Sequence, residues 1–270
     1  METINIIQSL QNQKYDTIIS SRQKFTDNLF PPSNESINFK KEEAKPLPRF
    51  LQSRVQTKPS ATVEYKWYRI SQIMRNYNLI KYNENGEENL IDDVLQGALG
   101  DCYYLCALSA LSEFKNRIIN IFHTTEINEF GCYRIRCYVH GEEIELVLDD
   151  YFPCLGSENA PQLAFSSVEV QDNNIWPLLL EKAWAKVNKN YNNIIDGTVG
   201  QAFQFLTPAG IDVHFHSDVN LEIFNHIKQA DDRKFIICCD ISEKPGSKTI
   251  AALSSMGLVS NHAYSIISVQ

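Results

Sequence analysis

The sequence lacks several features that mark whole classes of protein. It contains no run of 18 consecutive apolar residues, so it offers no candidate transmembrane helix. Its first residues, Met1 to Asn5, lack the basic and then apolar segments of a secretory signal, which speaks against export. No Asp-x-Asp-x-Asp-Gly loop of an EF-hand calcium site occurs. These absences predict a soluble, cytoplasmic protein.

Positive charge is also scarce. Lysine and arginine total 25 against 33 aspartates and glutamates, which gives a formal net charge of −8 at pH 7. A nucleic-acid-binding protein would present a basic face, so nucleic acid is not an expected partner. The seven cysteines are an odd number without regular spacing, which suits a reducing compartment better than a disulfide framework. Neither the charge nor the composition fixes the oligomeric state.

The most informative stretch that is present covers residues 96–103. An apolar stripe at helical spacing follows it, formed by Tyr104, Leu105, Leu108 and Leu111. This pattern predicts that Cys102 lies in the first turn of a helix, where unpaired backbone N–H groups and the helix dipole stabilise a thiolate. Gln96, six residues earlier, would donate its side-chain amide to the oxyanion that forms when a thiolate attacks a peptide carbonyl. The stretch therefore predicts a thiol nucleophile with its oxyanion donor.

The candidate general base is His262, near the start of the apolar run 260–269. Period-2 alternation predicts a strand that places His262, Tyr264, Ile266 and Ser268 on one face. His262 follows Cys102 by 160 residues (262 − 102), which is close to the separation of about 130–150 residues typical of papain-type proteases. A cysteine and a histidine in this order indicate a cysteine protease.

With these residues in view, the chain resembles the protease core of the calpains, the calcium-dependent intracellular cysteine proteases. The matching blocks are residues 67–73, 96–102, 147–153, 176–186 and 258–265, and the resemblance covers roughly residues 46–270. It implies an α+β, papain-like cysteine protease fold. A helical lobe would carry Cys102, and an incomplete β-rich lobe would carry His262, with the substrate between them.

Three segments are expected on this basis. Residues 1–45, rich in Asn, Gln, Ser, Lys and Glu, are predicted to form a flexible polar leader. Residues 46–210 would form the helical lobe and residues 211–270 a partial β-rich lobe. In the family, an Asn that orients the histidine lies further downstream than the eight residues that follow His262. Because an imidazole without this partner loses its fixed direction, we expect a weak or inactive protease.

The resemblance also implies a calcium ion in the first lobe, held partly by two acidic side chains. The first of these positions, nine residues before the nucleophile, is Asp93, whereas the second falls on the neutral Asn174. A neutral ligand weakens such a site. Two departures lie beside the catalytic residues, where Tyr103 replaces the family's Trp and Asn261 replaces its Gly. No organic cofactor is implied.

Two functions follow from these residues. The first is a calcium-dependent endopeptidase of limited proteolysis that acts on proteins or peptides, with Cys102 as nucleophile, Gln96 at the oxyanion and His262 as base. The second is a non-catalytic, calpain-like protein that regulates or binds partners. A transglutaminase-like thiol hydrolase is less favoured, because it would not predict the blocks at 147–153 and 176–186.

Other reactive side chains are expected to be structural. Cys106 and the pair Cys238-Cys239 lie in apolar surroundings and are predicted to pack in the core. His214 and His216 share a strand face and could hold a metal, but the sequence shows no third ligand nearby, so a structural role is favoured. The neighbouring Asp149 and Asp150 are predicted to have a structural role at a strand end, since a Cys-His mechanism needs no carboxylate pair.

Overall fold

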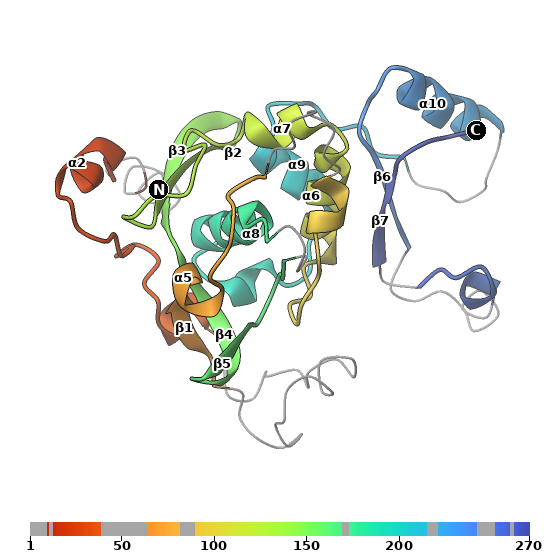
Figure 1. Ribbon diagram of the computed structural model, residues 1–270. Helices are drawn as coiled ribbons and strands as arrows, with labels where there is room; N and C mark the ends of the chain where they lie inside the picture. Colours follow the sequence, from red (N-terminus) through yellow and green to blue (C-terminus); the bar gives the residue numbers. More distant parts are fainter. Residues whose placement is uncertain are drawn as a thin grey trace.

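The computed structural model describes residues 10, 13–38, 64–81, 90–168, 173–214, 221–241, 252–259 and 262–270. Helices and small antiparallel sheets make up a mixed α+β architecture, as predicted (Figure 1). The helices are α2 (Tyr15–Ser20), α3 (Asn34–Ile37), α5 (Ile70–Ile73), α6 (Cys102–Ser112), α7 (Lys115–Ile119), α8 (Trp176–Val187), α9 (Val199–Leu206) and α10 (Leu221–Asp232), with short 3-10 turns η1 (Leu90–Asp93) and η2 (Tyr191–Ile194). The strands are β1 (Lys66–Arg69), β2 (Cys132–Val139), β3 (Glu142–Asp149), β4 (Tyr151–Ser157), β5 (Ala160–Leu163), β6 (Ile237–Ile241) and β7 (His262–Ile266).

Helix α6 is the central element of the first lobe. It is apolar on almost every side, and Tyr104, Ala107 and Leu108 are fully buried, which is typical of a helix enclosed by other elements. Tyr104 stacks on Trp184 of α8 with ring centroids 5.7 Å apart, and its hydroxyl donates to the Leu180 carbonyl at 2.7 Å. The prediction that Cys102 begins a helix is confirmed.

Two antiparallel sheets complete this lobe. Strands β2 and β3 form a hairpin whose turn residues His140 and Gly141 both have positive φ, 54° and 81°, as a two-residue turn matched to strand twist requires. Along β2, every second side chain from Tyr133 to Cys137 is buried, namely Tyr133, Ile135 and Cys137. Strands β1, β4 and β5 form the second sheet in the order β1-β4-β5.

The second lobe is smaller in the described part of the chain. Strands β6 and β7 pair antiparallel, with Ile241 opposite His262, and this pair packs against α6 (Figure 1). Helix α10 holds the last residues, since Asp231 Oδ2 accepts a hydrogen bond from the Val269 N–H at 2.9 Å. The hydrophobic core itself belongs to the first lobe, and after Leu206 the only buried apolar side chain among the described residues is Ala263.

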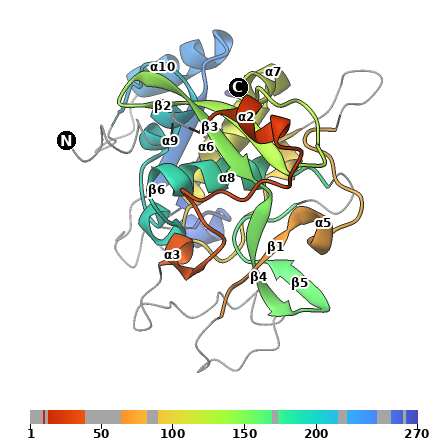
Figure 2. The same ribbon diagram turned by 90° about the vertical axis from the view of Figure 1, so that its left-hand side faces the viewer.

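The segment 13–38 differs from the leader expected over residues 1–45. It runs across the molecule from α2 to α3, shown in red in Figure 2. Asp27 and Phe30 are buried at 0% and 1% exposure, and Ser33 caps α3 by accepting a hydrogen bond from the Glu35 N–H. Although its composition is polar, this segment packs on the core, because its buried carboxylate, Asp27, forms an ion pair with a lysine of the core.

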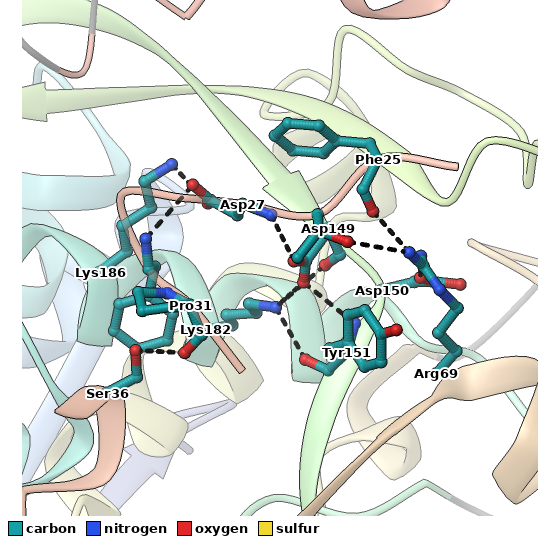
Figure 3. A network of polar contacts seen from close by, with 12 residues as sticks. Phe25, Asp27, Pro31, Ser36, Arg69, Asp149, Asp150, Tyr151, Lys182 and Lys186 are labelled. Atoms are coloured by element: carbon teal, nitrogen blue, oxygen red, sulfur yellow. Dashed lines mark hydrogen bonds and ion pairs between the residues drawn. The ribbon is translucent and has the colours of Figure 1, made fainter. Parts of the chain in front are cut away.

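Three buried ion pairs lie where the segment 13–38 meets the core (Figure 3). Lys186 of α8 lies 2.6 Å from the Asp27 carboxylate, and both side chains are fully buried. Lys182, one turn earlier, pairs with Asp149, whose other oxygen accepts the Asp27 backbone N–H at 2.7 Å. The third pair joins Arg69 and Asp150.

Arg69 also reaches the N-terminal segment, since it donates to the Phe25 carbonyl at 2.8 Å. Asp149 and Asp150 therefore have the structural role predicted for them, as the acidic centres that join 13–38, α8 and the β1 sheet. Among the described residues, no helix is long and apolar enough to cross a lipid bilayer.

Candidate active site

Cys102 is the first residue of α6, and its side chain is half-buried. The backbone N–H groups of Ala263, on β7, and of Tyr103 donate to its sulfur, and these hydrogen bonds lower the thiol pKa. Burial has the larger effect, so the pKa of Cys102 lies above its ordinary value. The structure thus confirms that Cys102 lies at the start of a helix. The burial of its side chain, however, favours the protonated thiol over the thiolate that the sequence predicted.

His262 begins β7, directly before the residue whose N–H contacts the Cys102 sulfur. Its ring meets that of Tyr264 edge-on, with centroids 4.9 Å apart, so the predicted shared face of these two side chains is confirmed. The Tyr264 hydroxyl in turn accepts a hydrogen bond from the Val259 N–H at 2.8 Å. The packing of β7 on α6 therefore brings the start of the histidine strand to the nucleophile. Asn261, the predicted departure beside the histidine, lies outside the described residues.

Gln96 lies exposed in the loop that leads into α6. Its side-chain Nε2 donates to the Leu99 carbonyl at 3.0 Å, so the amide folds back over its own loop. A primary amide carries two N–H donors, and this hydrogen bond uses one of them.

A close backbone approach fixes the Gln96 loop. A Cβ at Gly97 would lie 1.4 Å from the carbonyl oxygen of Phe165, so only glycine fits at this position. The next residue, Ala98, donates its N–H to the Ala164 carbonyl at 3.1 Å. The backbone at residues 164 and 165 therefore fixes the position of the loop that leads into α6.

Tyr103, which replaces the family's Trp, is buried and held by two hydrogen bonds. Its hydroxyl donates to the Ile194 carbonyl at 3.1 Å and accepts from Trp184 Nε1 at 2.9 Å. A Cβ at Gly197 would lie 2.5 Å from the ring, so the chain passes tightly against it. Tyr103 therefore places an aromatic ring beside the nucleophile, and its hydroxyl links the chain at Ile194 to Trp184 of α8.

A buried pair of carboxyl groups lies beneath the nucleophile, and the sequence did not indicate it. Asp101, the residue before Cys102, is fully buried, and Glu181 of α8 is 3% exposed. Burial raises the pKa of Asp101 to about 7 and raises the pKa of Glu181 well above its ordinary value. Glu181 Oε1 accepts the Ser166 N–H at 2.9 Å. A proton shared between the two carboxyl groups therefore joins the start of α6 to α8.

The candidate calcium residue Asp93 is buried and already surrounded by N–H donors. Its oxygens accept from Asn174 Nδ2 at 3.1 and 3.0 Å, and one of them accepts from Trp176 Nε1 at 2.7 Å. The Asn174 oxygen accepts the Lys81 N–H at 2.7 Å. Because a calcium site needs oxygen atoms directed at the ion, this arrangement of Asp93 and Asn174 does not fit a cation.

A second cysteine of α6 contacts the histidine lobe. Cys106 is buried one turn after Cys102, as predicted, and a hydrogen bond with Cys238 of β6 is the main cause that raises its thiol pKa. Cys238 is half-buried and Cys239 is exposed, so the prediction that this pair packs in the core is wrong for Cys239, because no side chain of β6 is fully buried. All seven cysteines are free thiols.

Comparisons with known proteins identify one family of similar sequences. The sequence model of a family described as "Calpain family cysteine protease" matches residues 25–270. The calpain-type cysteine protease ADL1 of Oryza sativa is 31% identical over 94% of this chain and 11% of its own length. Calpain-1 catalytic subunit of Mus musculus is 28% identical, over 94% of this chain and 33% of its own length. Calpain-5 of Caenorhabditis elegans is 27% identical, over 96% and 38%. The chain thus spans well under half the length of these relatives.

Proposed function

Because the chain belongs to the calpain family of cysteine proteases, we propose that it acts as a cysteine-type endopeptidase with Cys102 as its nucleophile. The observation that carries the proposal is the position of the Cys102 sulfur. It lies at the first residue of α6 and accepts a hydrogen bond from β7, the strand that begins with His262. Family membership supports proteins or peptides as the substrates.

In the proposed reaction, His262 takes the Cys102 proton and the thiolate attacks a peptide carbonyl carbon. Gln96 donates to the oxyanion of the tetrahedral intermediate, a contribution of about 3 kcal/mol to the barrier for one such donor. The C–N bond then breaks, the amine leaves with the proton from His262, and a thioester remains on Cys102. Water hydrolyses the thioester and restores the thiol, with His262 again moving the proton.

Calcium dependence, which the family resemblance implies, is not used in this reaction. Asp93 and Asn174 hydrogen-bond to each other and to their neighbours, and the reaction proposed above uses only Cys102, His262, Gln96 and water. Measurement of the reaction with calcium and with a chelator tests this separately. The free thiols are the observation that supports a reducing compartment such as the cytoplasm.

The proposal is tested with an epoxysuccinyl peptide probe and intact-mass analysis of the full chain. We expect one adduct, located on Cys102 by peptide mapping and absent in Cys102→Ser. The matched control is Cys239→Ser, which removes an exposed thiol on the strand paired with β7 and should label like the parent chain. Equal labelling of Cys102→Ser and the parent, or an adduct only on Cys239, would contradict the proposed nucleophile.

A non-catalytic binding or regulatory role is the second candidate function. It is favoured by one observation, the pKa of Cys102, which burial raises above its ordinary value. A peptidase assay with the same chain separates the two functions. Cleavage that disappears in Cys102→Ser and in His262→Ala supports the enzyme. A folded chain that binds peptide substrates without cleaving them supports the binding protein.

A further inference from the structure

Three potential metal ligands converge outside the candidate active site. Asp212 and His214 lie in the segment after α9, and His226 lies in the middle of α10. His214 Nε2 is 3.2 Å from Asp212 Oδ2, and His226 Nε2 is 3.7 Å from the same oxygen. All three ligand atoms lie within 4.8 Å of one another. The sequence had paired His214 with His216, which lies outside the described residues, and had shown no third ligand.

These separations match the distances between neighbouring ligand atoms around a bound metal ion. Zinc binds imidazole nitrogen and carboxylate oxygen at about 2.0–2.2 Å, so two ligands of a tetrahedral ion lie about 3.3–3.6 Å apart. The two distances to Asp212 Oδ2 lie near this range. Asp212 and His214 lie two residues apart in the chain between α9 and α10, and α10 holds His226 next to them.

Hydrogen bonding alone explains the cluster less well. Both imidazoles direct Nε2 at a single oxygen, and their rings approach to 4.7 Å between centroids. His226 Nε2, at 3.7 Å, lies beyond hydrogen-bonding distance of that oxygen, so a hydrogen bond accounts for one of the two imidazoles at most. One cation bound by two neutral imidazoles and the carboxylate satisfies all three groups at once.

We propose that Asp212, His214 and His226 form a binding site for a zinc-class divalent transition metal. Two imidazoles and one carboxylate suit zinc, whereas calcium prefers oxygen ligands alone. The fourth position is open to water or to Glu222, which precedes His226 by one helical turn and lines the same surface hollow. The bound metal joins the chain that leaves α9 to α10, and the site is independent of peptidase activity.

Cobalt absorption of the full chain tests the site directly, with Co²⁺ as a spectroscopic substitute for Zn²⁺. The parent is the Cys102→Ser variant, in which the candidate nucleophile cannot bind the metal. We expect visible d–d bands from one Co²⁺ per chain, lost on addition of Zn²⁺, without the sulfur-to-cobalt charge-transfer band of a thiolate site. His226→Ala and Asp212→Asn should each weaken binding by about tenfold or more.

The matched control is His123→Ala, because His123 is exposed and only its backbone N–H is hydrogen-bonded, to Arg134. It should bind Co²⁺ like the parent. The site is overturned if no d–d bands appear, if a charge-transfer band shows sulfur ligation, or if His216→Ala abolishes binding while His226→Ala does not. Circular dichroism confirms that each variant folds before its affinity is compared.

Discussion

At the scale of single residues, the main feature beneath the nucleophile is the buried carboxyl pair formed by Asp101 and Glu181. Asp101 has no donor for either buried oxygen among the described residues when its neighbours are ionised. A proton on Glu181 supplies that donor, and the resulting hydrogen bond lowers the pKa of Asp101 and raises that of Glu181. Burial is the larger cause, and it raises the pKa of both groups. The charge of the pair therefore changes with pH, although neither group takes part in the proposed proton transfers.

The pair predicts how stability changes with pH. A carboxyl group with a raised pKa holds its proton longer in the folded chain, so the folded state binds more protons between about pH 4 and pH 7. The contribution of the pair to stability is therefore present below about pH 4 and is lost as pH rises through about 7. Glu181→Gln keeps the acceptor for Ser166 and supplies Asp101 with a permanent donor. We expect it to be more stable than the parent at pH 8.

Urea unfolding at pH 5 and pH 8 measures this difference. The variant should gain about 1 kcal/mol or more relative to the parent between the two pH values, since one pKa unit corresponds to about 1.4 kcal/mol. Tyr138→Phe, an exposed change on β2, is the control and should follow the parent's pH dependence. Identical slopes for Glu181→Gln and the parent would show that the two carboxyl groups do not share a proton.

Gly97 offers a second test at this scale. Because a Cβ there would overlap the Phe165 carbonyl, Gly97→Ala must displace the loop that carries Gln96. We expect a loss of about 1–3 kcal/mol in the free energy of unfolding, together with slower labelling of Cys102 by the probe. Gly210→Ala, where a Cβ would meet nothing within 4 Å, should change stability by no more than about 1 kcal/mol. Similar stabilities for the two variants would contradict the close approach.

The sequence predicted the helix that begins at Cys102 and the strand of His262 because local patterns determine them. Helical spacing after Cys102 and alternation after His262 are visible within ten residues. The acid pair was not predictable in this way, since Asp101 and Glu181 are 80 positions apart (181 − 101) and only the packing of α6 on α8 unites them. The metal cluster depends on His226 of α10, which no pattern linked to His214.

At the scale of elements, the segment 13–38 is held by the ion pairs of α8. Asp27 and Lys186 are both fully buried, and Lys186 has further acceptors in Gln13 and in the Val147 carbonyl, each at 2.7 Å. The prediction of a flexible leader failed here because composition reports the average polarity of a segment. It does not report that one aspartate meets a lysine 159 positions away.

This arrangement predicts a large cost for removing Asp27. Asp27→Ala leaves the Lys186 ammonium buried without its counter-charge, and such losses cost about 3–5 kcal/mol. Lys66→Ala breaks the exposed pair with Glu158, whose side chains are 44% and 74% exposed, and should cost less than about 1 kcal/mol. Urea unfolding of both variants provides the comparison. A loss for Asp27→Ala no larger than that for Lys66→Ala would show that the segment is not fixed by this pair.

At the scale of the whole molecule, apolar burial is distributed unevenly along the chain. The two hydrophobic clusters are built from buried residues no later than Leu206. Most of the large apolar side chains that are exposed follow that point, namely Ile211, Val213, Phe224, Phe235, Met256, Val259 and Ile267. Since buried apolar area supplies most folding free energy, the described part of the histidine lobe is less stable than the lobe that carries Cys102.

Hydrogen exchange resolves this difference element by element. We expect the amides of α10, β6 and β7 to exchange faster than those of α6, α8 and the β2–β3 hairpin, because they open without unfolding the main core. Zn²⁺ should slow exchange in α10, where His226 lies, and should leave β2–β3 unchanged. His226→Ala should abolish that protection. Equal exchange in both lobes without metal would show that the β6–β7 pair unfolds only together with α6, and that the contacts of Ala263 and Cys238 with that helix are enough to make the two lobes one cooperative unit.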